Sequence, residues 1–131
     1  MAKLKSALTL LLSVFFILSG CNHFLHPAFY LRMMPAYLPW HRALVQASGV
    51  AEAGLGALVL LPRARRKAGW GIVALLIAVF PANIDMALHP ERFPEFRPAV
   101  LWIRLPLQFA LSALVLWCTR PRMRPIPKSM Q

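Results

Sequence analysis

The sequence predicts an all-α integral membrane protein, a bundle of four membrane-spanning helices. Of its 131 residues, 59% are hydrophobic and only 15% are charged, whereas soluble domains are about 45–50% apolar. The apolar excess forms four blocks, each close to the ~20 residues that a helix needs to cross the hydrocarbon core. These predicted spans are residues 6–25, 43–62, 68–88 and 99–118. The remainder is too short for a second domain, so residues 1–131 are taken as one domain.

The distribution of positive charge predicts that both termini are cytoplasmic. Four crossings place the N-terminus, the second connection and the C-terminus on one side, and most Lys and Arg residues fall there. These are Lys3, Lys5, Arg63, Arg65, Arg66, Lys67, Arg120, Arg122, Arg124 and Lys128. Basic residues accumulate on the cytoplasmic side of membrane proteins. The net charge of +11 therefore indicates topology and contact with lipid headgroups, and no nucleic-acid partner is expected.

The first predicted span has a second interpretation, as a bacterial lipoprotein signal. Lys3 and Lys5 precede an apolar run that ends in Leu18-Ser19-Gly20-Cys21. Cleavage would leave a lipidated Cys21 and three spans, and would move the basic C-terminal tail to the outer side, against the charge rule. It would also remove a helix that the others need for packing. We therefore expect the first span to be retained.

The connections between the spans differ in character. The first begins at His26, and Pro27 is well placed to start a helix that Pro35 ends. We expect a short amphipathic helix at the outer interface. The third connection, residues 89–98, carries three prolines and is expected to be an ordered loop without regular structure. Leu-His-Pro ends both the first and the third span, a weak sign of an internal repeat for which coincidence is the simpler explanation.

Polar side chains inside the predicted spans mark the candidate ligand-binding site, because such groups are costly in hydrocarbon. The candidates are Asn22, His23, Glu52, Asn83, Asp85, Arg104 and Gln108. With a rise of about 1.5 Å per residue, most of them lie in the outer half of the bundle, where we expect them to converge. The small residues Gly49, Ala53 and Gly56 predict close contact between the second span and a neighbouring helix.

Two accounts of this polar cluster are open, one structural and one functional. Arg104 is the only cation inside the spans, so we expect it to neutralise Glu52 or Asp85, with Glu52 favoured because it lies deepest. The pair would then fix helix register. Alternatively, Arg104 anchors a ligand in a pocket open to the outer leaflet. The acid left without a cation could carry a proton, which suits quinone chemistry.

A metal site is the least favoured account of the cluster. Its ligands would be His23, His26, Asp85 and His89. Histidines at the outer ends of spans are common without a metal, so no metal is expected. No residue can be assigned a catalytic role.

The residues assembled above resemble the DoxX family of small four-span bacterial membrane proteins. The matching segments are Gly20–Phe24, Ser48–Gly56, Val79–Ala87 and Trp102–Gln108, and the likeness covers about residues 8–118. The resemblance implies a multi-pass protein of the bacterial inner membrane that takes part in respiratory or thiol redox metabolism. The function expected from it is an accessory or subunit of a membrane oxidoreductase, with a quinone as candidate cofactor and a redox protein as candidate partner. The alternative is a non-enzymatic membrane scaffold or a module that binds lipid or a small ligand, and the sequence leaves open whether the protein is an enzyme.

Overall fold

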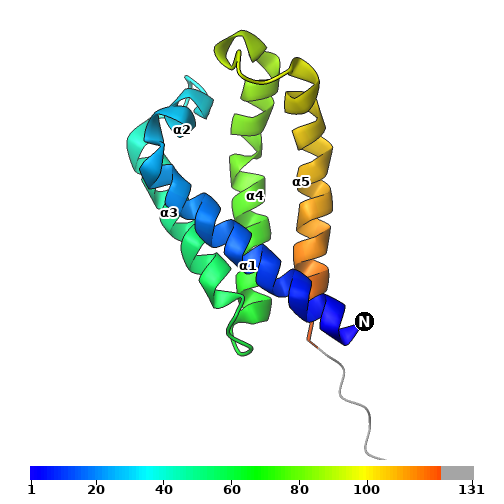
Figure 1. The fold of residues 1–131 in the computed structure, drawn as a ribbon. Coiled ribbons are helices and arrows are strands. Elements are labelled where there is room, and N and C mark those ends of the chain that lie inside the picture. Colours follow the sequence, from blue (N-terminus) through cyan, green and yellow to red (C-terminus); the bar gives the residue numbers. More distant parts are fainter. Residues whose placement is uncertain (122–131) are drawn as a thin grey trace, which may run out of the picture.

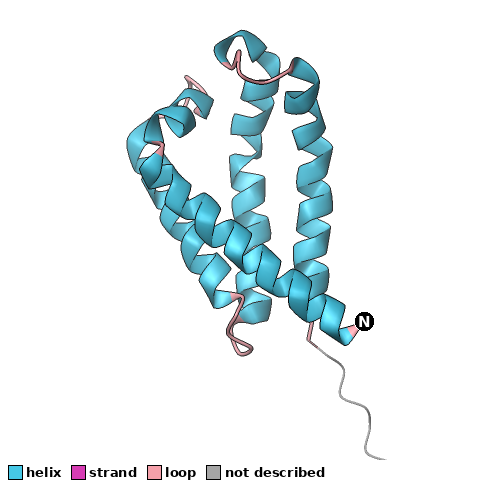
Figure 2. Cartoon of the chain, in the orientation of Figure 1, coloured by secondary structure: helices cyan, strands magenta, loops and turns pink. Residues whose placement is uncertain are grey.

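The computed structural model describes residues 1–121, and every regular element in this part of the chain is helical (Figures 1 and 2). The elements are α1 (Ala2–Leu25), α2 (Pro27–Met33), α3 (His41–Leu58), α4 (Arg65–Leu88), the 3₁₀ turn η1 (Pro90–Arg92) and α5 (Pro98–Thr119). The predicted all-α class and the short helix after the first span are confirmed. Arg122, Arg124 and Lys128, which entered the charge argument, lie outside the described residues.

Three helices of the described chain, α1, α4 and α5, are long and apolar enough to cross a membrane. The element at the predicted second span differs from them. Helix α3 has 18 residues and carries Arg42 and Glu52, which lower its mean hydropathy. It ends at Leu58 rather than at residue 62, because Pro62 has no N–H to donate and disfavours helical geometry in the residue before it. The membrane spans that the structure supports directly are therefore three.

The helices are arranged as two packed pairs, α1 with α3 and α4 with α5. Figure 1 shows the pairs close together at the end that holds the N-terminus, where Lys5 Nζ donates to the Arg120 carbonyl at 3.0 Å. Towards α2 and the connection between α4 and α5, the pairs diverge. The long helices therefore do not form a bundle with parallel walls, and at the divergent end Phe29 and Met33 of α2 pack on a buried cluster of Met86, Ala87, Phe93 and Leu101.

Glycines set the short distance between α1 and α3. A Cβ atom added to Gly20 would lie 2.5 Å from the Ala53 nitrogen, and one added to Gly49 would lie 2.7 Å from the Cβ of His23. The close contact predicted for Gly49, Ala53 and the second span is confirmed. Because the two backbones nearly touch, polar side chains of α1 reach those of α3.

Helices α1 and α4 end in the same way. Both have 24 residues, and their C-caps His26 and His89 have nearly equal dihedrals, φ −130° and ψ 58° against φ −123° and ψ 59°. A proline follows each cap and opens the next helical segment, α2 or η1. The third connection is thus not wholly irregular as predicted, since Pro90 starts a 3₁₀ turn. The matching ends add a structural likeness to the repeated Leu-His-Pro.

Candidate functional site

A cavity of about 570 Å³ lies between the two helix pairs. All five α-helices contribute to its wall, which is mainly apolar. Apolar members include Phe15, Phe16, Met33, Met34, Leu76, Val79, Leu107, Leu111 and Leu114. Five of the seven candidate residues also line it, namely His23, Glu52, Asn83, Arg104 and Gln108. Asn22 and Asp85 do not line it; Asn22 contacts the lining residue Tyr30, whereas Asp85 contacts His89 and Arg92, which lie outside the cavity wall.

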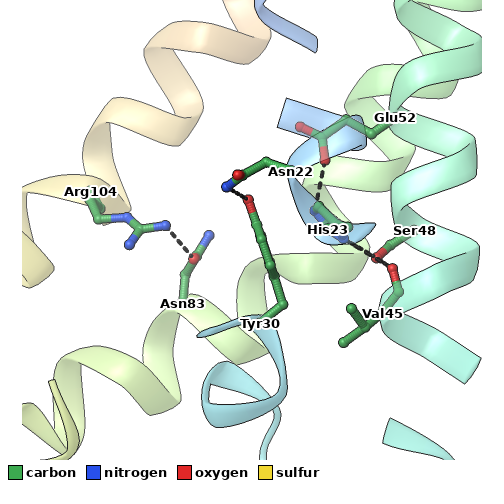
Figure 3. A network of polar contacts seen from close by, with 8 residues as sticks. All are labelled: Asn22, His23, Tyr30, Val45, Ser48, Glu52, Asn83 and Arg104. Atoms are coloured by element: carbon green, nitrogen blue, oxygen red, sulfur yellow. Dashed lines mark hydrogen bonds and ion pairs between the residues drawn. The ribbon is translucent and has the colours of Figure 1, made fainter. Parts of the chain in front are cut away.

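His23 of α1 and Glu52 of α3 form a buried pair, with Nε2 and Oε2 3.1 Å apart (Figure 3). The other ring nitrogen, Nδ1, lies 3.0 Å from the Val45 carbonyl oxygen. A carbonyl oxygen can only accept, so Nδ1 carries a proton. At 3.1 Å a further proton must lie between Nε2 and Oε2, because two lone pairs would repel. The pair therefore holds one shared proton and is neutral overall, whichever atom bears it.

Ser48 adds a contact that superficially completes a Ser–His–acid triad. Its Oγ lies 3.2 Å from His23 Nδ1. A triad needs an unprotonated imidazole nitrogen facing the hydroxyl, but Nδ1 donates to Val45. The Ser48 hydroxyl also donates to Val45 O, at 3.0 Å. The three residues are thus a structural hydrogen-bond network and not a nucleophile with its base.

Tyr30 of α2 joins this network and was not among the sequence candidates. Its ring stacks on His23 with centroids 3.8 Å apart, and its oxygen accepts a hydrogen bond from Asn22 Nδ2 at 2.9 Å. His26 Nδ1 contacts Asn22 Oδ1 at 2.7 Å, which fixes the amide orientation. Tyr30 lines the cavity, and no acceptor for its hydroxyl hydrogen is found among residues 1–121. The only sequence signal for it is a tyrosine on the helix that follows the first span.

A second network lies on α4 and α5, across the cavity. Gln108 Nε2 donates to the Leu76 carbonyl at 2.6 Å, and Gln108 Oε1 accepts from Asn83 Nδ2 at 2.7 Å. The amide of Asn83 is thereby oriented with its oxygen towards Arg104, whose Nη2 lies 3.4 Å from Asn83 Oδ1 (Figure 3). Arg104 Nη1 also donates to Met86 Sδ at 3.2 Å.

The predicted ion pair of Arg104 with Glu52 or Asp85 is wrong. Glu52 pairs with His23, and Asp85 contacts Arg92 at 3.1 Å and His89 at 3.3 Å. Asp85 lies near the end of α4, so the loop that follows can fold back onto it. Glu52 faces α1 on the opposite side of the cavity. Within residues 1–121, which hold all the acidic side chains, no carboxylate forms an ion pair with Arg104.

At the end where the helix pairs diverge, α2 contacts the connection between α4 and α5. Arg32 pairs with Glu95 and donates to the Arg92 carbonyl at 3.1 Å, while Arg92 donates to the Arg32 carbonyl. The hydrogen bond from Arg32 lowers the pKa of the exposed Glu95 carboxyl below its ordinary value. We call these contacts of Arg32, Arg92 and Glu95 the clasp. It ties the helix that carries Tyr30 to the other half of the molecule.

The alternative metal site is not formed. In the part of the chain that the structure describes, no three His, Cys, Asp or Glu side chains are grouped closely enough to hold a metal ion. His23 and His89 contact different acids, Glu52 and Asp85.

A sequence model of a family described as a domain of unknown function (DUF8561) matches residues 12–121. The chain belongs to the DUF8561 family. The resemblance to DoxX was therefore misleading as an assignment of family. Its motifs combine small residues at helix contacts with prolines and sparse polar groups, which the packing of any small bundle of apolar helices favours. No curated protein and no solved structure matches the chain.

The cavity of this DUF8561 chain presents polar groups on two sides. One side of the cavity offers a tyrosine hydroxyl and a neutral His–Glu pair, and the other offers the guanidinium of Arg104. Both lie at the boundary of a large apolar wall. Convergent polar groups beside an apolar wall are typical of small-molecule sites.

Proposed function

We propose that this protein is a membrane-embedded module that binds an amphiphile between its two helix pairs. The polar head of the ligand contacts the Tyr30 hydroxyl and Arg104, and its apolar tail lies along residues such as Phe15, Leu111 and Leu114. The observation that carries the proposal is the cavity itself. Its volume of about 570 Å³ falls in the range of about 300–1,000 Å³ that ligand pockets occupy.

The depth of the cavity supports a ligand that is dissolved in the membrane. Its wall is built largely from α1, α4 and α5, the three helices apolar enough to cross a bilayer. A ligand drawn from the lipid phase enters such a site without crossing water. The clasp, at the end where the helix pairs diverge, holds the helix that carries Tyr30 beside the head group.

The proposal includes four crossings, with both termini on the cytoplasmic side of the bacterial inner membrane. Helix α3 is less apolar than the others, yet two polar residues in its interior have partners within the protein. Glu52 pairs with His23, and Ser48 bonds to the Val45 carbonyl. Polar groups facing the interior are compatible with a spanning helix. The excess of Lys and Arg at the N-terminus and in the second connection supports the orientation.

A second candidate is the quinone-linked accessory of a membrane oxidoreductase. Its basis in the DoxX resemblance is gone, but one observation favours it. The Tyr30 hydroxyl is a hydrogen-bond donor that could meet a quinone carbonyl, and its ring stacks on His23, which shares a proton with Glu52. This candidate requires binding of a quinone and a redox partner, whereas the first requires only the amphiphile.

Native mass spectrometry of the full chain released from detergent micelles tests the proposal, with hexadecanol, palmitate and decylubiquinone as probes. Ala110 lines the cavity, so Ala110→Phe fills it and should weaken binding of any bound probe about tenfold or more. Ala113→Phe is the matched control, since Ala113 lies on the same helix, is exposed and does not line the cavity. Equal binding by both variants would show that the cavity is not the binding site. Selective retention of decylubiquinone would favour the second candidate.

A further inference from the structure

We infer that the head group of the ligand is a single anion, a carboxylate or a phosphate, held by Arg104. The inference rests on the proposed function and adds the sign of the charge that the site selects. It follows from a count of the charges that surround the cavity and of the partners that each one has.

Every acidic side chain of the protein is accounted for without Arg104. Glu52 pairs with His23, Asp85 with Arg92, and Glu95 with Arg32. Glu91 is the fourth, and it is exposed on η1. Within the described chain, therefore, no acidic side chain neutralises the guanidinium of Arg104.

The His23–Glu52 pair does not change this balance. The Val45 carbonyl fixes a proton on Nδ1, and the 3.1 Å contact between Nε2 and Oε2 needs one more proton between them. A neutral histidine facing a carboxylic acid and an imidazolium facing a carboxylate have the same net charge of zero. The pair thus contributes no net charge to the cavity wall in either form.

The neighbours of Arg104 solvate its charge only weakly. They are the Met86 sulfur at 3.2 Å and the Asn83 oxygen at 3.4 Å, both neutral. Sulfur is a weak acceptor, and an N···O distance of 3.4 Å is longer than the usual range for N–H···O bonds. Arg104 is half-buried and lines the cavity. A guanidinium so placed is costly without a counter-ion, and an anion entering the cavity supplies one.

The surroundings are also arranged to receive an anion. Gln108 holds the Asn83 amide so that its oxygen, not its nitrogen, faces Arg104, which orients the guanidinium in advance. Tyr30 supplies a hydroxyl donor from α2. A guanidinium and a hydroxyl together match the acceptor oxygens of a carboxylate or phosphate. A neutral head group would leave the charge unbalanced.

The test compares head groups on the same C16 chain, using the full protein in detergent micelles and native mass spectrometry. The probes are palmitate, hexadecanol, hexadecyltrimethylammonium and palmitoyl lysophosphatidylglycerol. We expect palmitate or the phosphodiester to bind about tenfold or more tightly than hexadecanol, because hydrogen bonds to charged groups exceed those to neutral ones. The cation should bind least. A preference for palmitate identifies a free carboxylate as the ligand type, and one for the phosphodiester identifies a lipid headgroup.

Variants of Arg104 test whether this residue causes the preference for an anionic head group. Arg104→Gln should remove the preference, so that palmitate and lysophosphatidylglycerol bind this variant no more tightly than hexadecanol does. Arg104→Lys, which keeps the charge, should retain part of the preference even if the glutamine variant folds poorly. Arg63→Gln is the control, because Arg63 is exposed in the turn before α4 and does not line the cavity.

The outcomes separate this inference from the proposed function. Equal affinity for palmitate, lysophosphatidylglycerol and hexadecanol, all weakened by Ala110→Phe, would overturn the anion and leave the amphiphile-binding module standing. A preference for the anion that survives in Arg104→Gln would overturn the role of Arg104. Failure of every probe to bind would overturn both.

Discussion

The Nε2 atom of His23 lies 3.1 Å from Oε2 of Glu52, across the contact between α1 and α3. The histidine is 7% exposed and the glutamate side chain 15%, so the shared proton is held in a largely dry environment. The contact exists because Gly49 lets the two helices approach closely. Helix packing and the polar wall of the cavity therefore depend on the same residues.

Replacing Glu52 should separate a hydrogen-bond role from a charge role. Glu52→Leu leaves the Nε2 atom of His23 without a partner, which should destabilise the protein by about 1–3 kcal/mol. In Glu52→Gln the amide N–H can still donate to Nε2, so this variant should lose less free energy of unfolding. Unfolding by sodium dodecyl sulfate in mixed micelles measures both, with the exposed Glu91→Gln as control. Equal losses for the leucine and glutamine variants would show that the pair is an imidazolium–carboxylate pair that needs the charge.

Double-mutant cycles should show no coupling between Arg104 and either Glu52 or Asp85. Arg104 forms no ion pair with Glu52 or Asp85 in the described chain. The free energy of unfolding lost in a double variant should therefore equal the sum of the losses in Arg104→Leu and in Glu52→Gln or Asp85→Asn, to within about 0.5 kcal/mol. The same unfolding measurement checks this. Recovery of stability when one acid is neutralised would instead identify that acid as the partner of Arg104.

The clasp should loosen in acid. The hydrogen bond from Arg32 lowers the pKa of Glu95 below its ordinary value of 4.5. The stabilisation is therefore complete above about pH 4.5 and is lost as the pH falls through the lowered pKa. A spin label at Ala36, just after α2, in a background without other cysteines should become more mobile in that range.

Two variants check that Glu95 is the titrating group. Glu95→Gln should make the label mobile at every pH, and high salt should have a similar effect because the pair is exposed. Arg97→Gln, at an exposed position near the same loop, should leave the profile unchanged. An unaltered pH profile in Glu95→Gln would show that another group controls α2.

Adding one methyl group to the α1–α3 contact should be destabilising. Gly20→Ala places a Cβ 2.5 Å from the backbone of Ala53, which forces the helices apart at a cost of about 1–3 kcal/mol. Gly54 lies on the same helix as Ala53, and nothing lies within 4 Å of the Cβ it would carry. Gly54→Ala should therefore be neutral or slightly stabilising, since alanine favours helix. Equal effects of the two variants would contradict the close packing.

Reporter fusions should locate the two ends of the molecule. A reporter active only in the periplasm should be silent when it follows Arg120 and active when inserted at Pro94, because four crossings place these sites on opposite sides. With only the three most apolar helices spanning, residues Lys3 and Arg120 would lie on opposite sides. Activity of the fusion after Arg120, together with a silent one near Lys3, would reject the four-span arrangement.

The sequence by itself determined the elements that depend on local composition. Three of the long apolar helices, the helix that Pro27 opens and the close contact at Gly49 all follow from hydropathy, proline chemistry and side-chain size. Each of these properties belongs to a residue and its near neighbours along the chain. The end of α3 was placed too late because hydropathy continues through Leu61, while the effect of Pro62 on the preceding turn ends the helix earlier.

Tertiary structure alone decided which polar groups meet. The sequence places Glu52 near the middle of its span, with Arg104 and Asp85 further outward, and by composition alone an ion pair between Arg104 and one of these acids is the cheapest arrangement. The pairs α1–α3 and α4–α5 diverge, however, so Glu52 meets His23 while Asp85 meets Arg92 on the loop beyond its own helix. Tyr30 enters the site in the same way, from a helix outside the predicted spans. The pairing of polar groups depends on the distances between helices. Those distances are set by close contacts within each helix pair, such as Gly20 against Ala53 and Gly69 against Thr119, which leave the cavity between the pairs.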